Sequence, residues 1–354
     1  MLVIYARIPI ELRLADSATA TSIGERMVLS KRQFINFSII AVISACLTFP
    51  LKVLATTPAP DVLSSTSTTA TITTPHMTIF QAVVLGFVQG FTEFLPISST
   101  AHLKVVPVAL GWGDPGVAFT AVIQLGSIAA VVWYFWGDLS KVTTGAFKAI
   151  RTSDYQSQDF QMALGIALGT LPIVFFGLLI KIFIPDYDNS PIRSTMSIAY
   201  VSIVMGLLMG VSEVVGKRKR NFEDLGLKDG IGMGLAQALA LMPGVSRSGS
   251  TLTAGLFMGL ERATAARFSF LLGIPAITLA GLVELVGLLK DGIGDAGGMS
   301  LIVGVISSAV FSYVAIAWMI NYLKKQGVWI FVWYRLLFGL VILGGIITGL
   351  LQNS

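Results

Sequence analysis

Long apolar stretches recur along this 354-residue chain from residue 33 to its end, and they limit what the chain can fold into. A helix that crosses the hydrocarbon core of a bilayer needs about 20 predominantly apolar residues. Only 12% of the residues are charged, against roughly 25% in a soluble domain. The sequence therefore predicts an all-α polytopic membrane protein. The stretches after Met77 that are long enough to span are 115–136, 160–183, 195–216, 264–289, 299–321 and 329–351.

The few charged and metal-ligating residues exclude several classes of function. Lys and Arg number 24 against 19 Asp and Glu, and the excess of +5 lies in short loops, where it reports membrane topology. No basic stripe of the kind that binds nucleic acid is present, so no nucleic-acid partner is expected. Cys46 is the only cysteine, and His76 and His102 are the only histidines. An internal disulfide and a metal site built from His and Cys are therefore excluded.

The first 76 residues differ from the rest of the chain. Residues 1–32 form a polar segment, and Met27 offers a second start that would make the first 26 residues an artefact of start assignment. Residues 33–56 are apolar after a basic flank, which predicts a signal peptide or an N-terminal anchor. Residues 57–76 are rich in Thr, Ser and Pro and cannot bury a core, so we interpret them as a linker. The membrane domain is expected over 77–354.

Two further apolar regions, 77–113 and 229–261, are interrupted by polar clusters. Each splits into pieces of about 12–17 residues, which are too short to span comfortably. The basic loops 137–159, 217–228 and 324–325 belong in the cytoplasm, and the acidic loops 184–194 and 291–298 belong outside. Because the span 264–289 already accounts for that crossing, region 229–261 must enter and leave on the cytoplasmic side. Counting the membrane crossings in the same way places both ends of region 77–113 outside. Both regions are therefore predicted to be re-entrant hairpins.

The two interrupted regions contain matching segments, GFVQGFTEFLPISST and GLAQALALMPGVSRSGS. In each segment a Gly precedes a Gln by three residues, and a Pro and a Ser cluster follow. Nine residues separate Gln89 from Ser98, and nine separate Gln237 from Ser246. This match predicts that the membrane domain arose by duplication.

The predicted duplication divides the domain into repeat 1 (77–216) and repeat 2 (229–354). Each repeat contains one hairpin and three spans, and an odd number of crossings turns the second repeat upside down. The expected fold is therefore an inverted-topology repeat with six transmembrane helices plus two re-entrant helical hairpins. In such folds the broken segments meet near the bilayer midplane, where they form the binding site.

Each predicted hairpin tip carries polar residues that are rare at membrane depth. In the first, Gln89 and Glu93 share one helix face, and Ser99 and His102 share a face of the following helix. In the second, Arg247 stands among small hydroxyl residues where a helix should begin, an arrangement suited to phosphate. Ionisable residues at this depth are usually functional. The alternative is that Glu93 and Arg247 form a structural ion pair.

The motifs QGFTEFLPISSTAH and PGVSRSGST make residues 77–354 resemble the undecaprenyl-diphosphatase family, integral membrane phosphatases of the bacitracin-resistance type. The resemblance implies hydrolysis of undecaprenyl diphosphate to undecaprenyl phosphate and inorganic phosphate. This reaction recycles the lipid carrier for cell-wall synthesis and confers bacitracin resistance. The sequence departs from the family at Gln89, where many members carry a second carboxylate, and at Ala101, which replaces a common Gly. The first departure puts in doubt any mechanism that needs two acids there.

Carried over position by position, the resemblance places the catalytic roles on Glu93, Ser99, His102 and Arg247. Ser99 is the candidate nucleophile, and His102 is its base or the acid for the leaving phosphate. Glu93 would orient His102 or hold a divalent cation, Mg²⁺ or Ca²⁺. In the alternative mechanism water attacks directly and Ser99 only binds phosphate. The residues expected to contact the substrate phosphates are Gln89, Ser98, Thr100, Ser246, Ser248, Gly249 and Thr251.

A second function remains open, because inverted repeats with broken helices are typical of secondary transporters. The chain would then be a transporter or flippase of a polyprenyl phosphate lipid. As an enzyme it would act on a polyprenyl diphosphate lipid from within the bilayer of the bacterial cytoplasmic (inner) membrane. Because Glu93, Ser99 and His102 lie on the hairpin that enters from outside, the active site is expected to open to the periplasmic side. The sequence leaves the oligomeric state open.

Overall fold

The computed structural model describes residues 77–113, 115–184, 187, 190–291, 297–351 and 353. The predicted polar segment, anchor and linker, residues 1–32, 33–56 and 57–76, lie outside these residues. The described part is helical, and its one β-bridge is an isolated pair. Its α-helices are α2 (Ile79–Phe94), α3 (Ser99–Ala109), α4 (Val117–Tyr134), α5 (Trp136–Thr152), α6 (Gln158–Phe183), α7 (Thr195–Val215), α8 (Leu227–Ala238), α9 (Arg247–Phe257), α10 (Arg262–Asp291), α11 (Gly298–Leu323) and α12 (Trp329–Ile347), with 3₁₀ turns η1 (Pro191–Arg193), η2 (Phe222–Asp224) and η3 (Leu239–Leu241).

Five of these helices, α6, α7, α10, α11 and α12, are long and apolar enough to cross a membrane. Helix α4 makes a sixth candidate when it is taken together with α5, to which it is bent by 71°. These helices cover the six predicted spans to within a few residues at each end. The chain is therefore a multi-pass helical membrane protein.

The interpretation of residues 137–159 as a loop is wrong, because most of this segment forms α5. Val142 and Ala149 are buried seven residues apart, while Lys141 and Lys148 are exposed. Such spacing gives an amphipathic helix, whose apolar stripe faces its neighbours. The charges lower the mean hydropathy of the segment and hide this periodic pattern from a search for apolar runs.

Both interrupted regions form broken helix pairs, as predicted. Region 77–113 contains α2 and α3, and region 229–261 contains α8, η3 and α9. At the break before α3, Ser98 has φ 74°, and at the break before α9, Ser246 has φ 69°. A positive φ is uncommon for a residue other than glycine, and Ser98 and Ser246 are equivalent in the predicted repeat. The two breaks therefore share one unusual backbone conformation.

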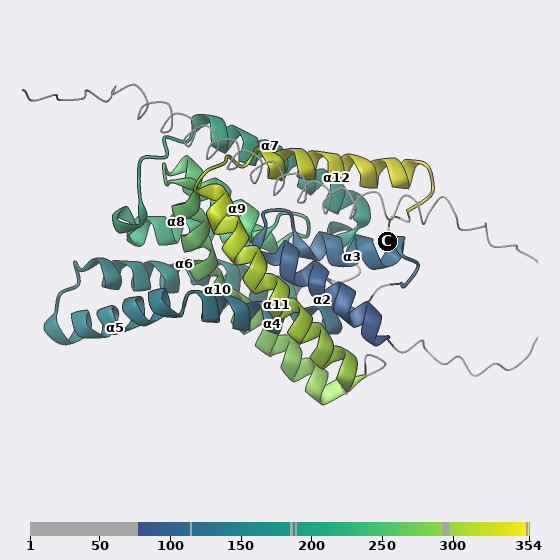
Figure 1. Cartoon of the computed structure of the whole chain (residues 1–354), viewed down its shortest axis with the longest axis horizontal. Coiled ribbons are helices and arrows are strands. Elements are labelled where there is room, and N and C mark those ends of the chain that lie inside the picture. The colour runs from purple at the N-terminus through teal and green to yellow at the C-terminus, as the bar shows by residue number, and fades with distance from the viewer. Residues whose placement is uncertain are drawn as a thin grey trace, which may run out of the picture. The chain divides into compact units, whose positions relative to one another are not determined.

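The first helix of each broken pair packs closely on a long helix from the other half of the chain. Helix α2 lies along α11 and α8 lies along α6, and the former pair can be followed in Figure 1. A Cβ atom on Gly90 would lie 2.4 Å from the Ser308 carbonyl oxygen, and one on Gly230 would lie 2.3 Å from the Gly165 backbone. Small residues permit such contact between membrane helices, where dispersion rather than water exclusion drives association.

Segments that the charge pattern assigns to one side of the membrane lie together. Asp138 at the start of α5, Phe222 in η2 and Lys324 after α11 line one hollow of about 420 Å³. Arg267 from α10 is ion-paired with Asp138 and lies over the Phe222 ring, 3.9 Å from its centroid. The loops predicted to be cytoplasmic are thus neighbours in the structure.

Gly230 gives a test of the α6–α8 contact. We expect Gly230→Ala to lower the free energy of unfolding by about 1–3 kcal/mol, because the added methyl group overlaps the Gly165 backbone and must separate the helices. Gly344→Ala on α12 is the matched control, since a Cβ there meets no atom within 4 Å. Thermal unfolding of the purified variants in detergent measures both changes. Equal melting temperatures for the two variants would contradict the close packing.

Candidate active site

A cavity of about 200 Å³ lies where the two broken helix pairs meet. Its polar wall comes from both breaks and from α4. On the other side α6 contributes Ile173, and α10 contributes Ala276, Ile277 and Ala280. The cavity therefore suits a ligand with a polar head and an apolar tail. The polar residues of the wall are Glu93, Ser98, Ser99, Thr100, Gln124, Ser246 and Arg247.

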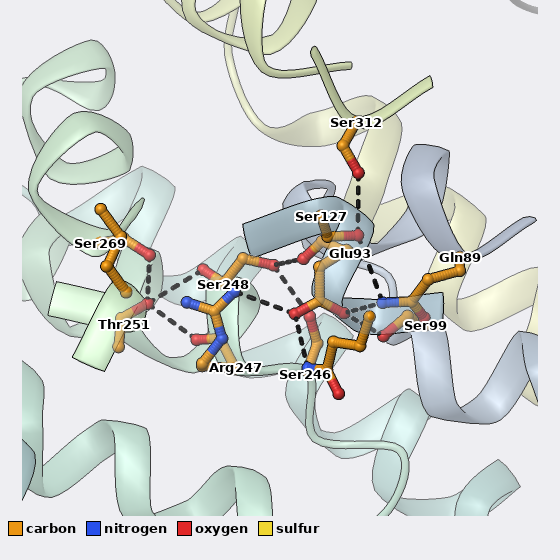
Figure 2. A network of polar contacts seen from close by, with 12 residues as sticks. Gln89, Glu93, Ser99, Ser127, Ser246, Arg247, Ser248, Thr251, Ser269 and Ser312 are labelled. Carbon is orange, nitrogen blue, oxygen red and sulfur yellow. Dashed lines mark hydrogen bonds and ion pairs between the residues drawn. The ribbon is translucent and has the colours of Figure 1, made fainter. Parts of the chain in front are cut away.

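The buried carboxylate of Glu93 is the centre of the polar wall (Figure 2). Its Oε1 accepts a hydrogen bond of 3.0 Å from Arg247 Nη2. Its Oε2 accepts bonds from Ser99 Oγ at 2.7 Å and from Gln89 Nε2 at 3.0 Å. Gln124 Nε2 from α4 approaches Oε1 at 3.4 Å. The structure thus joins the predicted residues Glu93, Ser99, Gln89 and Arg247 in one network.

Arg247 uses only part of its guanidinium for the ion pair. Its Nη1 is buried and has no hydrogen-bond partner among the described residues. The group lies against Gly273 of α10, where an added Cβ would be only 1.5 Å from Nη1. An unsatisfied buried donor costs free energy until an acceptor reaches it. Because Arg247 also lines the cavity, its guanidinium has a donor beyond the one used by Glu93.

The predicted hydroxyl residues of the second break form hydrogen bonds with backbone groups of the two breaks. Ser246 Oγ accepts a bond from the Gly249 backbone N–H at 3.2 Å and so caps α9. Ser248 Oγ donates to the Leu95 carbonyl oxygen at 2.9 Å, which ties the start of α9 to the end of α2. Thr251 Oγ1 donates to the Arg247 carbonyl oxygen at 2.7 Å. Of these residues only Ser246 lines the cavity.

His102 lies outside the cavity lining. Its Nδ1 is 2.7 Å from the Ser98 carbonyl oxygen, and its Nε2 is 2.6 Å from Tyr334 Oη. The ring is buried and stacks on Phe338 with centroids 4.5 Å apart. Both ring nitrogens are therefore engaged away from Ser99, whose hydroxyl donates to Glu93 instead. The proposed acid–base role of His102 stays a prediction.

Arg335 of α12 is a residue that the sequence analysis missed. It is fully buried. Among the described residues, its guanidinium donates hydrogen bonds to backbone carbonyl oxygens only. Nη1 bonds Pro96 at 3.1 Å, Nη2 bonds Gly244 at 2.6 Å, and Nε bonds Ser202 of α7 at 3.2 Å. Pro96 and Gly244 are 148 residues apart, the same separation as Ser98 and Ser246. One side chain thus binds the same backbone position in both breaks.

A signal for Arg335 was present in the sequence. It is an ionisable residue inside the predicted span 329–351, and the rule that singled out Glu93 and Arg247 applies to it equally. Gln124 carried no comparable signal, because a neutral polar residue in a membrane helix often serves packing alone.

The fold and the cavity define a multi-pass helical membrane protein in which a guanidinium, a buried carboxylate and a hydroxyl meet at two helix breaks. The chain belongs to the bacitracin resistance protein BacA family, whose sequence pattern matches residues 82–341. It is 64% identical over 331 residues to an undecaprenyl-diphosphatase of Nostoc sp., covering 93% of this chain and 100% of that protein. Undecaprenyl-diphosphatases of Trichodesmium erythraeum and Synechocystis sp. are 66% and 67% identical, over 79% and 75% of this chain and 89% and 81% of their own lengths.

Replacing the Arg335 guanidinium tests its role at the two breaks. We expect Arg335→Lys to lower the free energy of unfolding by about 2 kcal/mol or more, because a point-like ammonium cannot reach the Pro96 and Gly244 carbonyls together. The exposed Arg151→Lys on α5 is the matched control. Thermal unfolding in detergent gives the comparison. An Arg335→Lys protein as stable as the control would show that the breaks do not need this fork.

Proposed function

We propose that the chain hydrolyses undecaprenyl diphosphate to undecaprenyl phosphate and inorganic phosphate. The observation that carries the proposal is that Arg247, whose Nη1 has no partner among the described residues, lines one cavity together with the hydrogen-bonded Ser99–Glu93 pair. A guanidinium presents planar donors that match phosphate oxygens. Relatives that are 64–67% identical carry the name undecaprenyl-diphosphatase. The product would return to cell-wall synthesis, and its supply would confer bacitracin resistance.

The amphipathic cavity supports a lipid diphosphate as the substrate. The diphosphate would meet Arg247 and the hydroxyl groups of Ser99 and Thr100. The prenyl chain would leave along the apolar wall formed by Ile173 and Ile277, toward the bilayer. Ala276 and Ala280 on the same wall are small, which leaves room for a branched chain.

In the mechanism that the geometry favours, Ser99 Oγ attacks the terminal phosphorus of the substrate. Glu93 Oε2, 2.7 Å from that hydroxyl, accepts its proton. The bond from the terminal phosphorus to the bridging oxygen breaks, and undecaprenyl phosphate leaves with the electron pair and takes the proton from Glu93, which becomes a carboxylate again. Water then hydrolyses the phosphoserine, with Glu93 again as base, and releases inorganic phosphate. Glu93 thereby takes the role of base that the sequence analysis assigned to His102.

The alternative in which water attacks the terminal phosphorus directly uses the same groups. Glu93 would then deprotonate the water, and Ser99 would only bind a phosphate oxygen. In either case Arg247 neutralises charge on the phosphoryl oxygens as the bond breaks. Trapping of a phosphoserine at Ser99 distinguishes the two routes.

A divalent cation, Mg²⁺ or Ca²⁺, fits the donor set in a limited way. Among the described residues, no three His, Cys, Asp or Glu side chains are grouped so that they could hold a metal ion. Glu93 is the only carboxylate of the cavity lining, and Gln89 and Gln124 lie beside it. Mg²⁺ is commonly held by one or two carboxylates together with substrate phosphates, so Glu93 would hold it with the diphosphate. The cation would supply further charge neutralisation at the phosphates.

We also infer that the two broken pairs are re-entrant hairpins of an inverted repeat. The shared backbone conformation of Ser98 and Ser246, and the binding of Arg335 to Pro96 and Gly244, support two equivalent halves. Helix α2 packs on α11 in the other half, and its equivalent α8 packs on α6 in the first half. A pseudo-two-fold axis between the halves would relate these two contacts. With the basic loops in the cytoplasm, the active site would open to the periplasmic side of the inner membrane.

Gly273 provides a way to displace Arg247 without changing its charge. We expect Gly273→Ala to lower the rate of phosphate release from undecaprenyl diphosphate about a hundredfold, as for loss of one oxyanion donor, because the new methyl group overlaps Arg247 Nη1. Arg247→Lys should recover little activity, since Lys lacks the planar fork. The assay uses purified protein in detergent.

The matched control is Gly287→Ala on the same helix, where a Cβ meets no atom within 4 Å. Wild-type turnover in Gly273→Ala would remove Arg247 from the site. Absence of phosphate release by the wild-type protein itself would favour the transporter, because transport needs two compartments and hydrolysis does not.

The orientation of the domain can be tested with single cysteines in a Cys46→Ser background. Thr66→Cys and Trp112→Cys should react with an impermeant thiol reagent added to intact spheroplasts, because both segments are expected outside. Lys219→Cys, which is exposed in the basic loop, should react only after lysis. The reverse labelling pattern would invert the topology and place the reaction at the cytoplasmic face.

A further inference from the structure

Behind Gln89, away from the cavity, lies a group of three serines that we name the Ser127 cluster: Ser127 of α4 with Ser308 and Ser312 of α11. All three are 0% exposed. Ser312 Oγ donates to Ser127 Oγ at 2.8 Å, and the Ser127 and Ser308 hydroxyls are 3.0 Å apart. Gln89 Nε2 approaches Ser127 Oγ at 3.5 Å, as Figure 2 shows, so the cluster joins the Glu93 network.

The hydrogen-bonding capacity of Ser127 is fully used in this arrangement. A hydroxyl has one proton to donate and two lone pairs that accept. The lone pairs accept from Ser312 and Gln89, so the proton of Ser127 goes to Ser308. The amide of Gln89 therefore finds an acceptor, and no spare donor, on its α4 side.

We propose that Ser127 is a positioning residue for Glu93 that acts through the side-chain amide of Gln89. By accepting one N–H of Gln89, Ser127 turns the amino group toward Glu93 Oε2, to which it donates at 3.0 Å. The opposite orientation of the amide would place its oxygen against the carboxylate. Because Ser99 donates to the same Oε2, the orientation of Gln89 sets the rotamer in which Glu93 meets Ser99. The inference rests on the proposed function, in which Glu93 is the base.

The second half of the chain lacks this arrangement. Gln237, the repeat equivalent of Gln89, is fully buried, and neither of its side-chain polar atoms has a partner among the described residues. The position equivalent to Glu93 is Leu241. Aligning Gly126 with Gly273 places Ile274 at the position of Ser127.

The α11 serines also have no counterpart on α6. The two long helices can be aligned through their contacts with α2 and α8. Gly304 of α11 faces the Ala82 carbonyl oxygen, and Gly169 of α6 faces the Gly230 carbonyl oxygen. Ala82 and Gly230 are 148 residues apart and thus equivalent in the repeat. In this register Ile173 corresponds to Ser308 and Gly177 to Ser312. The shared helix packing therefore does not require the hydroxyls, which occur only in the half that carries the carboxylate.

The competing explanation is that these serines serve close helix packing alone, as small residues often do in membranes. Ser307→Ala is a matched control for that role. Ser307 neighbours Ser308 on α11 and donates to the Val83 carbonyl oxygen of α2 at 2.8 Å, outside the Glu93 network. A packing role predicts the same result for Ser307→Ala and Ser127→Ala.

Steady-state kinetics of purified protein with undecaprenyl diphosphate in detergent test the proposal. We expect Ser127→Ala to lower kcat about five- to tenfold with KM unchanged, while Ser307→Ala keeps the wild-type kcat. In a Gln89→Ala background, Ser127→Ala should cause no further loss, because the residue acts through the missing amide. Melting temperatures of the two single variants should agree.

Three outcomes of these kinetic measurements would overturn the proposal. An unchanged kcat in Ser127→Ala, a loss equal to that of Ser307→Ala, or additive losses in the double variant would show that Ser127 does not act through Gln89. If Ser127→Ala fails to fold, Ser312→Ala gives the same test in both backgrounds. Failure of the proposed function is distinct, since the wild-type protein would then release no phosphate.

Discussion

The contact of Arg335 with the two helix breaks is the constraint on which the site depends. A broken helix leaves backbone carbonyls unpaired, and such groups are costly where no water reaches them. The guanidinium of Arg335 satisfies Pro96 in one break and Gly244 in the other, and its Nε bonds Ser202 of α7. The separation of the breaks is therefore set by a rigid, planar group anchored in α12.

With the breaks held in this way, two residues far apart in the chain meet. Glu93 lies in the last turn of α2 and Arg247 begins α9, and the two residues, 3.0 Å apart, both line the cavity. The ion pair was the structural alternative at the sequence level, yet Arg247 keeps a buried donor that the pair does not use. The ion pair therefore leaves room for the proposed phosphate contact, because a guanidinium has more donors than one carboxylate oxygen needs. In the proposed repeat the two halves differ at the carboxylate, since the position equivalent to Glu93 is Leu241.

The success of the sequence analysis depended on how local each signal was. Apolar length located the long helices, and the match around Gln89 and Gln237 located both broken pairs. The loop interpretation of 137–159 was wrong because charges outweighed the amphipathic pattern of α5. Helical spacing correctly linked Gln89 to Glu93, but it also suggested that His102 faces Ser99. The stacking of His102 beside Tyr334 comes from α12, which spacing within one helix cannot reveal.

The sequence by itself determined the long apolar helices, the two positions where helices break and the unusual placing of Glu93 and Arg247 at those breaks, because these follow from hydropathy and local backbone preference. Only the tertiary structure decided the partner of each polar side chain. Glu93 could have met His102, a metal or Arg247, and Arg335 could have been a structural residue at a lipid interface. Hydrogen bonds form over about 3 Å, so the choice depends on how helices distant in the chain pack, and residue spacing carries no measure of that distance.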